Sequence, residues 1–511
     1  MHTTRNIYLH ETLDLDAALT IIGYGKFHCK IMIACALCFI SSGVQYGLTA
    51  YAMPAAQCEL NLTSLQIGLI NSSFLIGAIF SSFLWGVLAD LKGRKKVLIT
   101  TLLLNVVMTV CCALSQSVNE IIVFRFINGF LAGASGSVSF SYMAEFHAPL
   151  HRTRTIHYAG VFFTVPWLIL PALAWWVLTL NIEVIVNDFI LISPWRIFLM
   201  LLVTPELIGG LWLIHLPETP KFLSTINQEE AVQVLQKMYE INNKRRKEDF
   251  PVNFVSQNAQ IQVNLKSNNN EFKKVVIKIV RQIFSLFETP LWISTALVTS
   301  IMFSNMFGYF GLGLWLPQVL VRKHENLNNS TITSTDLPNT CLLNFGQDLY
   351  RNTVIVGISA ILANIFAGWL SGKVNNKVIP ITTLMMGAIC SAWIFWVDDE
   401  IQYLIASCIF QSSLSVANIA IGTVAVDMFP TNVNAIGICT TMLSGRLGAI
   451  FSNMVFGFVI DENPAIPIFL IVSILMFGSI MCFFIPSSKK TEKQKINDPI
   501  FCITKKITMF H

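Results

Sequence analysis

Long apolar stretches separated by short polar turns run through most of the chain. A helix of about 20 apolar residues is long enough to cross roughly 30 Å of hydrocarbon. We count twelve such windows, near residues 31–53, 67–90, 97–115, 119–145, 155–180, 194–215, 290–316, 351–372, 378–397, 401–426, 433–460 and 465–485. The pattern therefore predicts an all-α polytopic membrane protein with twelve transmembrane helices.

A polar segment of about 70 residues separates the sixth window from the seventh and leaves six windows on each side. Weak internal repetition accompanies this layout, because "MAEFHAPLHR" after window four is similar to "VDMFPTNVN" after window ten. Two related halves are typical of transporters built from parallel repeats. We expect an N-terminal segment 1–30, a six-helix half 31–215, a loop with amphipathic helices 216–289, a second six-helix half 290–486 and a tail 487–511.

The polar segment itself has three parts. "NQEEAVQVLQKMYEINNKRRK" predicts a helix capped by Asn227, with acids in its first turn and basic residues in its last. Residues 253–270, rich in Asn, Gln and Ser, are typical of a flexible linker. "EFKKVVIKIVRQIFSLFETP" separates basic from apolar side chains on a helix, which favours a helix lying in the membrane surface over a solvated one.

Basic residues mark alternate turns. They follow windows two, four and eight, whereas the turns after windows one, three, five, nine and eleven hold no Lys or Arg. Lys and Arg near span ends resist translocation, so we expect these even turns and both termini to be cytoplasmic. Residues 1–28 lack the apolar core of a cleavable signal peptide. The membrane is either the plasma membrane or that of an intracellular vesicle.

The composition agrees with a bilayer protein. Hydrophobic residues make up 54% of the 511 residues, and mean hydropathy is +0.62. The net charge of +5 comes mostly from the basic turns, so no nucleic-acid partner is expected. "GWLSGK" does not complete a phosphate-binding loop, and the chain has no HExxH, paired CxxC or nucleophile elbow. We expect no enzyme activity, no cofactor and no metal site.

Two features fall in turns that this topology places outside. "NNST" offers glycan acceptors at Asn328 and Asn329. Cys58 and Cys341 also lie in outward loops, where they either form a disulfide or stay free.

The turn "GVLADLKGRKK" concentrates five charges between Asp90 and Lys96. An acid at the end of a helix opposes the helix dipole unless a cation or another helix N-terminus is near. Glycines at 86 and 93 permit close backbone approach. We hypothesise a latch that holds the two halves together on the cytoplasmic face. Positive-inside anchoring alone is the alternative, and it explains the Lys and Arg residues but neither the acid nor the glycines.

This turn resembles the signature G-x-x-x-D-(R/K)-x-G-R-(R/K) of the major facilitator superfamily. "RFINGFLAG", "FSYMAEFHAPLHR", "PETPKFL" and "VDMFPTNV" resemble the synaptic vesicle glycoprotein 2 and organic-ion transporter branch. The resemblance covers nearly all twelve windows. It implies the major facilitator fold, with windows one, four, seven and ten lining a central cavity for a small-molecule solute, with or without a proton or cation.

A cytoplasmic gate set follows from the hypothesis and the resemblance, with Glu145 grouped with Arg152 in one ion-pair set. Leu91 stands where the signature has a basic residue, which weakens the latch. Asn434 replaces an Arg expected near Asp427. The expected gate residues are Gly86, Asp90, Gly93, Arg94, Glu145, Arg152, Glu218 and Asp427.

Three ionisable residues lie well inside windows, where charge is costly and usually faces a cavity. Arg125 matches the family's R-x-x-x-G and is suited to an anionic group or to proton release. Arg446 could contact solute or pair with an acid of the other half. Glu206, beside Pro205, is not implied by the family; it either exchanges a proton during transport or is a neutral carboxyl bonded to a neighbouring helix.

Neutral residues replace acids that the family carries. Ser42 and Gln45 stand where vesicle glycoproteins have two acids, and Asn418 and Gly422 replace a Trp and an Asp, which questions coupling through those acids. The resemblance also singles out Trp175. Other polar residues on the lining windows either contact solute or hydrogen-bond to a neighbouring helix; they are Tyr46, Asn305, Tyr309 and Gln411.

We therefore expect a monomeric secondary or facilitative transporter of a small polar organic solute, a sugar or an organic ion. The alternative is a vesicle receptor or regulator that keeps the scaffold without transporting.

Overall fold

The structure is a computed structural model of the full chain. It describes residues 12–180, 184–186, 190–252, 254–256, 281, 283–289, 291–329, 347–370, 374, 377–397, 399–430, 433–463 and 465–485.

Helices make up the first half of the bundle. Their bounds are α2 Lys26–Gly47, α3 Thr49–Leu60, α4 Ser64–Lys92, α5 Arg94–Leu114, α6 Val118–Glu145, α7 Pro149–Thr164, α8 Pro166–Leu178, α9 Pro194–Leu202 and α10 Thr204–Ile214. Between α8 and α9, strands β2 (Val184–Val186) and β3 (Ile190–Ile192) pair in antiparallel fashion over three residue pairs.

The second half consists of α14 Trp292–Asn329, α15 Gln347–Leu370, α16 Val378–Trp396, α17 Glu400–Met428, α18 Asn434–Val459 and α19 Ala465–Phe483. Between the halves come α11 (Pro220–Ile226), α12 (Gln228–Asn243), a 3₁₀ turn (Lys247–Asp249) and strand β4 (Phe254–Ser256). Strand β4 pairs in parallel with β1 (Thr12–Asp14), which precedes helix α1 (Leu15–Ile22).

Twelve segments of the described residues are long and apolar enough to span a membrane, which confirms the twelve predicted windows and the all-α fold class. The first, fifth and sixth spans each consist of two helices, interrupted at Leu48, Val165 and Val203. In the fifth and sixth spans, a proline lies in the first turn of the second helix, Pro166 of α8 and Pro205 of α10, where its missing N–H is tolerated.

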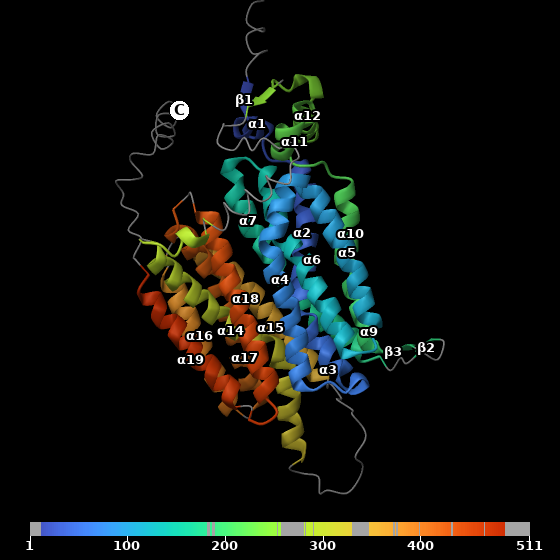
Figure 1. The fold of residues 1–511 in the computed structure, drawn as a ribbon, viewed down its shortest axis with the longest axis vertical. Coiled ribbons are helices and arrows are strands. Elements are labelled where there is room, and N and C mark those ends of the chain that lie inside the picture. Colours follow the sequence, from blue (N-terminus) through green and yellow to red (C-terminus); the bar gives the residue numbers. More distant parts are fainter. Residues whose placement is uncertain are drawn as a thin grey trace, which may run out of the picture.

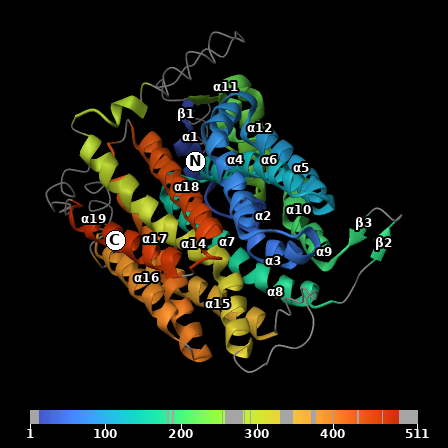
Figure 2. The same ribbon diagram turned by 60° about the horizontal axis from the view of Figure 1, so that its bottom comes forward.

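The two sets of spans pack mainly within themselves. Helices α2 to α10 lie on one side of the molecule and α14 to α19 on the other (Figures 1 and 2). Helices α1, α11 and α12 cover one end of the first set, which we name the α12 end; the opposite end, with α3, β2 and β3, is the α3 end (Figure 1). Across the middle, α4 packs along α18, and α15 packs against α8.

The loop helix was predicted correctly at its start and wrongly at its end. Asn227 accepts hydrogen bonds from the N–H groups of Glu229 and Glu230 as the expected cap. The basic residues that follow do not form its last turn, because Lys244 adopts a left-handed conformation that ends the helix at Asn243. Most of the linker 253–270 and the helix predicted from residue 271 lie outside the described residues.

Candidate functional site

A buried carboxylate lies at the centre of the first half. Glu206 is 1% exposed, and its Oε1 accepts three hydrogen bonds. The donors are Ser41 Oγ at 2.8 Å, Gln45 Nε2 at 3.1 Å and Asn105 Nδ2 at 2.6 Å. Its other oxygen, Oε2, has no partner among the described residues. The site thus combines a concentrated set of donors on one oxygen with a second oxygen able to carry a proton.

Gln45 connects this carboxylate to a buried cation. Its Oε1 accepts from Arg125 Nη1 at 2.9 Å, while its Nε2 donates both to Glu206 and to Thr109 Oγ1. Arg125 is 1% exposed, donates a second bond to the Gln45 backbone carbonyl at 2.8 Å, and lies 4.3 Å from the Phe74 ring centre. The amide dipole is therefore oriented between a positive and a negative group, with its oxygen toward the cation and its N–H toward the carboxylate.

Helix interruptions place both ends of this network. Glu206 lies in the first turn of α10, just after the break at Val203, where the helix dipole favours a negative charge. Arg125 donates to the Gln45 carbonyl three residues before the break at Leu48. Irregular backbone at membrane depth needs such internal partners, because lipid offers none.

The second half carries a stripe of neutral polar side chains. Asn305 and Tyr309 lie one turn apart on α14, and Gln411, Ser415 and Asn418 share one face of α17, which packs against α14. Asn305 is 0% and Gln411 3% exposed. The Asn305 amide has no hydrogen-bond partner at either terminal atom among the described residues, whereas the Gln411 amide lies against the Tyr309 hydroxyl. We name these five residues the amide stripe.

Aromatic rings from the two halves meet beside the amide stripe. Trp167 of α8 packs edge-on against Tyr309 with ring centres 5.5 Å apart. Tyr46 of α2 lies 5.6 Å from Phe310 of α14. The stripe and the Glu206 network thus flank a common boundary between the halves.

Hydrogen bonds join the halves from the α3 end to the middle of the bundle. Asn453 Oδ1 on α18 accepts from Asn71 Nδ2 on α4 at 3.1 Å and from Trp315 Nε1 on α14 at 3.0 Å. Ser64 Oγ donates to Asp461 Oδ1 at 2.8 Å nearer the α3 end. Halfway along, Arg446 Nη1 donates to the Ala78 carbonyl at 2.6 Å. We name this line of contacts the seam.

The glycines at the seam allow the helices to cross closely. A Cβ on Gly68 would lie 2.7 Å from the Asn453 carbonyl oxygen, and one on Gly457 would lie 3.0 Å from that of Ser64. Neither position accepts a larger residue without separating α4 from α18.

The charged turn at the α12 end makes its described contacts within the first half. Asp90, whose side chain is 71% exposed, pairs with Arg94 at 2.7 Å, and Arg94 also pairs with Glu145 at 3.1 Å. Glu218 accepts from the backbone N–H of Lys95 at 3.0 and 3.1 Å and so caps the start of α5.

Two details of the gate set differ from expectation. Glu145 pairs with Arg94 and Lys221, whereas Arg152 pairs with Asp16 of α1 at 2.7 Å, so these two residues do not form one ion pair with each other. Gly86 does not permit a close approach here, since an added Cβ would meet nothing within 4 Å. Gly93 does need to be glycine, because its φ is +97° and a Cβ would meet Glu218.

A family comparison fits this geometry. The model described as "Major Facilitator Superfamily" matches residues 35–335 and 351–502, most of the chain. The chain belongs to the major facilitator superfamily.

Relatives within the superfamily confirm the resemblance to the synaptic vesicle glycoprotein 2 and organic-ion transporter branch. The mouse synaptic vesicle glycoprotein 2B is 19% identical, with 92% of this chain and 84% of the relative covered. Organic cation/carnitine transporter 7 of Arabidopsis thaliana is 23% identical, with 92% and 93% covered. The benzoate transport protein of Acinetobacter baylyi is 22% identical, with 97% and 96% covered.

Solved structures show the same fold. The inward open conformation of the xylose transporter XylE from E. coli superposes with a TM-score of 0.66 at 16% identity, over 91% of this chain and 98% of the other. Membership of the superfamily indicates a membrane transporter rather than an enzyme.

One charged cluster, formed by Arg196 and Glu59, was not predicted from the sequence. Arg196, 0% exposed, donates to Glu59 at 2.8 and 3.2 Å and to the carbonyls of Ala113 and Ser115, both at 2.7 Å. Glu59 also accepts from Ser193 and from Trp195 Nε1 at 2.6 Å. Burial acts to raise the pKa of Glu59, but these hydrogen bonds and the Arg196 charge outweigh it, so the pKa lies below its ordinary value. An arginine just inside a predicted window was the available signal.

Other expected residues are placed as follows. Ser42 is buried, and its hydroxyl has no partner among the described residues. Trp175 lies on the exposed face of α8, 38% exposed. Asn328 and Asn329 end α14, with side chains outside the described set, and Asp427 lies exposed near the end of α17. Cys341 and the side chain of Cys58 lie outside the described residues.

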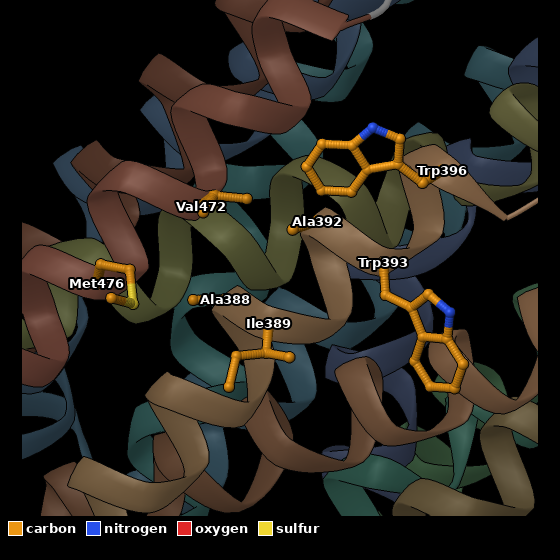
Figure 3. A pocket seen from close by; sticks show the side chains of 7 residues that line it. All are labelled: Ala388, Ile389, Ala392, Trp393, Trp396, Val472 and Met476. Carbon is orange, nitrogen blue, oxygen red and sulfur yellow. The ribbon is translucent and has the colours of Figure 1, made fainter.

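An apolar groove of about 430 Å³ lies elsewhere, on the outer surface of α16 and α19 (Figure 3). Trp393 and Trp396 border it and are 38% and 63% exposed, respectively. In a membrane protein such a surface faces hydrocarbon, so the groove is separate from the polar site. It is lined by Ala388, Ile389, Ala392, Trp393, Trp396, Val472 and Met476.

Proposed function

We propose that the chain is a secondary transporter of a small polar organic solute that works by rocking its two halves about a central site. Polar groups of both halves flank their common boundary, and the seam joins the halves over only part of the bundle's length. Such a contact can break at one end while another forms at the opposite end, which is the geometry that alternating access requires.

The α12 end is the cytoplasmic end in this proposal. Lys92, Lys95 and Lys96 lie there, and basic residues are retained on the cytoplasmic side. The seam then closes the outer side, and the structure corresponds to an inward-facing state. The similarity to an inward open xylose transporter supports this assignment.

The observation that carries the proposal is the Glu206 network. A fully buried carboxylate has its protonated form favoured, while the donors on Oε1 and the charge of Arg125 favour the ionised form. Proton binding would weaken the orientation of the Gln45 amide and hence its bond to Arg125. Because Gln45 and Arg125 lie on different spans, protonation of Glu206 can be linked to a rearrangement of the first half.

Uptake by purified protein in liposomes, with and without an inward-acidic or outward-acidic gradient, tests the proposal. We expect Glu206→Gln to abolish gradient-driven accumulation, a loss of about tenfold or more, while exchange of solute across the membrane persists. Glu462→Gln, at an exposed acid beyond the end of α18, is the matched control and should transport normally. Unchanged gradient-driven uptake in Glu206→Gln would show that Glu206 does not couple proton movement to transport.

A receptor or regulator without transport is the second candidate. The similarity to synaptic vesicle glycoproteins favours it, as does the presence of Ser42 and Gln45 where that branch has two acids. In that case no solute would be accumulated or exchanged by the reconstituted wild-type protein under any gradient.

The relatives whose names include a substrate differ in the chemical class of that substrate. They are an organic cation/carnitine transporter, a benzoate transport protein and a xylose transporter. Since these solutes include a cation, an anion and a neutral sugar, the class carried by this chain has to be argued from its own residues.

A further inference from the structure

Four aromatic side chains gather at the α12 end, away from the polar site described above. The rings of His28, in the first turn of α2, and His147, between α6 and α7, have centres 4.7 Å apart, and these residues are 3% and 0% exposed. The Tyr24 ring, just before α2, lies 5.1 Å from His28, 5.9 Å from His147 and 5.7 Å from His151 of α7. We name these four residues the imidazole cluster. The proposed transport step uses none of them.

Each of the two buried imidazoles keeps one nitrogen without a hydrogen. His147 Nδ1 lies 2.7 Å from the Met143 carbonyl, which only accepts, so Nδ1 carries the hydrogen of the neutral ring. Its Nε2 has no partner among the described residues. In His28 the hydrogen lies on Nε2, which faces a backbone carbonyl, and Nδ1 accepts from Asn242 Nδ2 at 3.1 Å and from the Gly25 N–H at 3.3 Å. A proton would therefore bind Nε2 of His147 or Nδ1 of His28.

Protonation of His28 breaks its contact with α12. Nδ1 becomes a donor, and it then faces two other donors, the Asn242 amide and the Gly25 N–H. The same Asn242 side chain accepts from the Phe27 N–H at 3.0 Å and donates to the Gly23 carbonyl at 3.1 Å. Because one amide makes all of these bonds, turning it away from His28 weakens the others as well.

Protonation of His147 adds a charge to a place that already carries one. His151 and Arg152 of α7 face this ring, and Arg152 pairs with Asp16 of α1 at 2.7 Å. Burial lowers the pKa of His147 below its ordinary value, and the two α7 residues act in the same direction, whereas the Met143 bond acts against them. A buried cation without a counter-charge is costly, so protonation destabilises the packing around His147.

The other titratable groups at this end do not neutralise that charge. The Glu145 carboxylate at the end of α6 is paired with Arg94 at 3.1 Å and with Lys221 at 3.9 Å. The Cys29 thiol of α2 interacts with the tyrosine of the cluster. On α12, the side chain that meets the cluster is the neutral amide of Asn242.

Helices α1 and α12 form one unit over the imidazole cluster. They pack on each other, and the pairing of β1 with β4 joins the segments that flank them. Asn243 Nδ2 of α12 also donates to the Ile22 carbonyl at the end of α1, at 3.1 Å. Figure 1 shows the two helices together at this end of the molecule. We name them the cap.

We propose that the imidazole cluster is a pH switch, which releases the cap from the start of α2 when the solution at the α12 end becomes mildly acidic. The switch goes beyond the transport function and does not depend on it. The attached form binds a proton on His147 more weakly than the released form, so attachment is complete above the ordinary histidine pKa of 6.5 and weakens as the pH falls below it.

Hydrogen exchange of the purified full chain, followed by mass spectrometry, tests the proposal. Amide exchange of residues 228–243 is measured at pH 7.5 and at pH 5.5, and each rate is divided by the intrinsic rate at that pH. We expect the corrected rate to be about tenfold or more higher at pH 5.5, since this pH lies about one unit below the ordinary histidine pKa. The corrected rate of α5 should not change. Equal corrected rates for α12 at both pH values overturn the proposal.

Variants that cannot take up the proton locate the switch. His147→Asn keeps a donor near the position of Nδ1 and has no titratable nitrogen, so it should reduce the acid effect several-fold. Adding His28→Gln, whose amide replaces the Nε2 donor, should abolish the pH dependence. His215→Asn, at an exposed position just beyond α10 at the same end, is the matched control and should respond to acid as the wild type does.

Two outcomes with these variants would contradict the switch. An acid effect of wild-type size in the double variant would place the sensor elsewhere and overturn the proposal. If α12 of the double variant exchanges near the intrinsic rate at both pH values, His147→Asn alone decides, because it leaves the bonds of His28 in place. An undiminished acid effect in that single variant then overturns the proposal.

Discussion

Arg196 is a fully buried cation held by one partly exposed carboxylate and two backbone carbonyls near the α3 end. Removing one partner of a buried ion pair leaves the other charge uncompensated, a loss of about 3–5 kcal/mol when both charges are buried. The side chain of Glu59 is 20% exposed, so solvent reduces that figure. The cluster ties the ends of α3, α5 and α9 together.

Replacing Glu59 with Gln should lower the unfolding temperature in detergent at neutral pH, by an amount corresponding to about 2 kcal/mol. The pKa of Glu59 is lower when folded than when unfolded, so its stabilisation is present above the ordinary carboxyl pKa and is lost as the pH falls through the folded value. The gap between variant and wild type should therefore narrow in acid. The account would be contradicted if the difference in unfolding temperature between Glu59→Gln and wild type were constant with pH, or if it equalled the difference for Glu462→Gln.

Single residues were predictable where an ionisable group interrupts an apolar window. Glu206, Arg125 and Arg446 all stand out in this way, and the structure places each in a hydrogen bond to another helix. Their partners were less visible. Asn105 is one polar residue within an apolar run, and nothing in its neighbourhood along the chain shows that it faces a carboxylate 101 positions away.

Among the elements, α12 is attached to the first span by one side chain near its end. Asn242 Oδ1 accepts from the Phe27 N–H at 3.0 Å, and its Nδ2 donates to the Gly23 carbonyl at 3.1 Å. The same amide lies 3.1 Å from His28 Nδ1, whose other ring nitrogen is 3.1 Å from the Phe146 carbonyl. Since a carbonyl only accepts, His28 Nε2 carries the hydrogen and Nδ1 accepts from Asn242.

Asn242→Ala should release α12 from the start of α2 with little effect on the membrane-spanning bundle. We expect limited proteolysis after residue 243 to become several-fold faster, because three hydrogen bonds are lost at once. Lys237→Ala, at an exposed position of the same helix, should be cleaved at the wild-type rate. Equal cleavage of both variants would show that the Asn242 hydrogen bonds do not hold α12 in place.

The ends of helices could be predicted from the sequence where nearby residues determine them. Asn227 predicted the start of α12, and Pro205 marked the break in the sixth span. The end of α12 was wrong, because charge pattern favoured a longer helix and the left-handed turn at Lys244 depends on local backbone geometry. Short strand pairs such as β1 with β4 join segments about 240 positions apart, beyond the reach of any local pattern.

At the scale of the whole molecule, the proposed mechanism assigns the seam the role of closing the α3 end. Asn71→Leu removes the amide bond to Asn453 and leaves a buried Asn453 with one donor fewer. We expect a shift toward the state that is open at the α3 end. Spin labels at Asn61 and Glu462, both exposed at that end, should show a larger population of long distances. Ser473→Ala on α19 should leave the distribution unchanged.

Asp90→Asn should shift the same distribution the other way. In the present state Asp90 forms an exposed pair with Arg94, worth about 0–1 kcal/mol, so its removal costs little here. If Asp90 latches the halves at the α12 end in the opposite state, neutralising it destabilises that state and raises the population of short Asn61–Glu462 distances. An unaltered distance distribution would leave positive-inside anchoring as the role of this turn.

The number of spans and the division into halves were readable from hydrophobicity, because lipid makes the same demand on every span. The conformation of the bundle could not be predicted from hydrophobicity. In the proposed mechanism, two packings of the same helices would differ by contacts such as Asn71 with Asn453, which join residues 382 positions apart. In the proposed mechanism, the latch predicted at Asp90 would hold the halves together in the state opposite to the one described here.

The crossing of Gly68 and Gly457 offers a way to prepare the missing state. A tryptophan at either position would occupy space now filled by the backbone of the opposite half, and the pair could no longer shut. Such a wedged protein would be held open at the α3 end. A preparation fixed in that form would suit structure determination and antibody selection against one face.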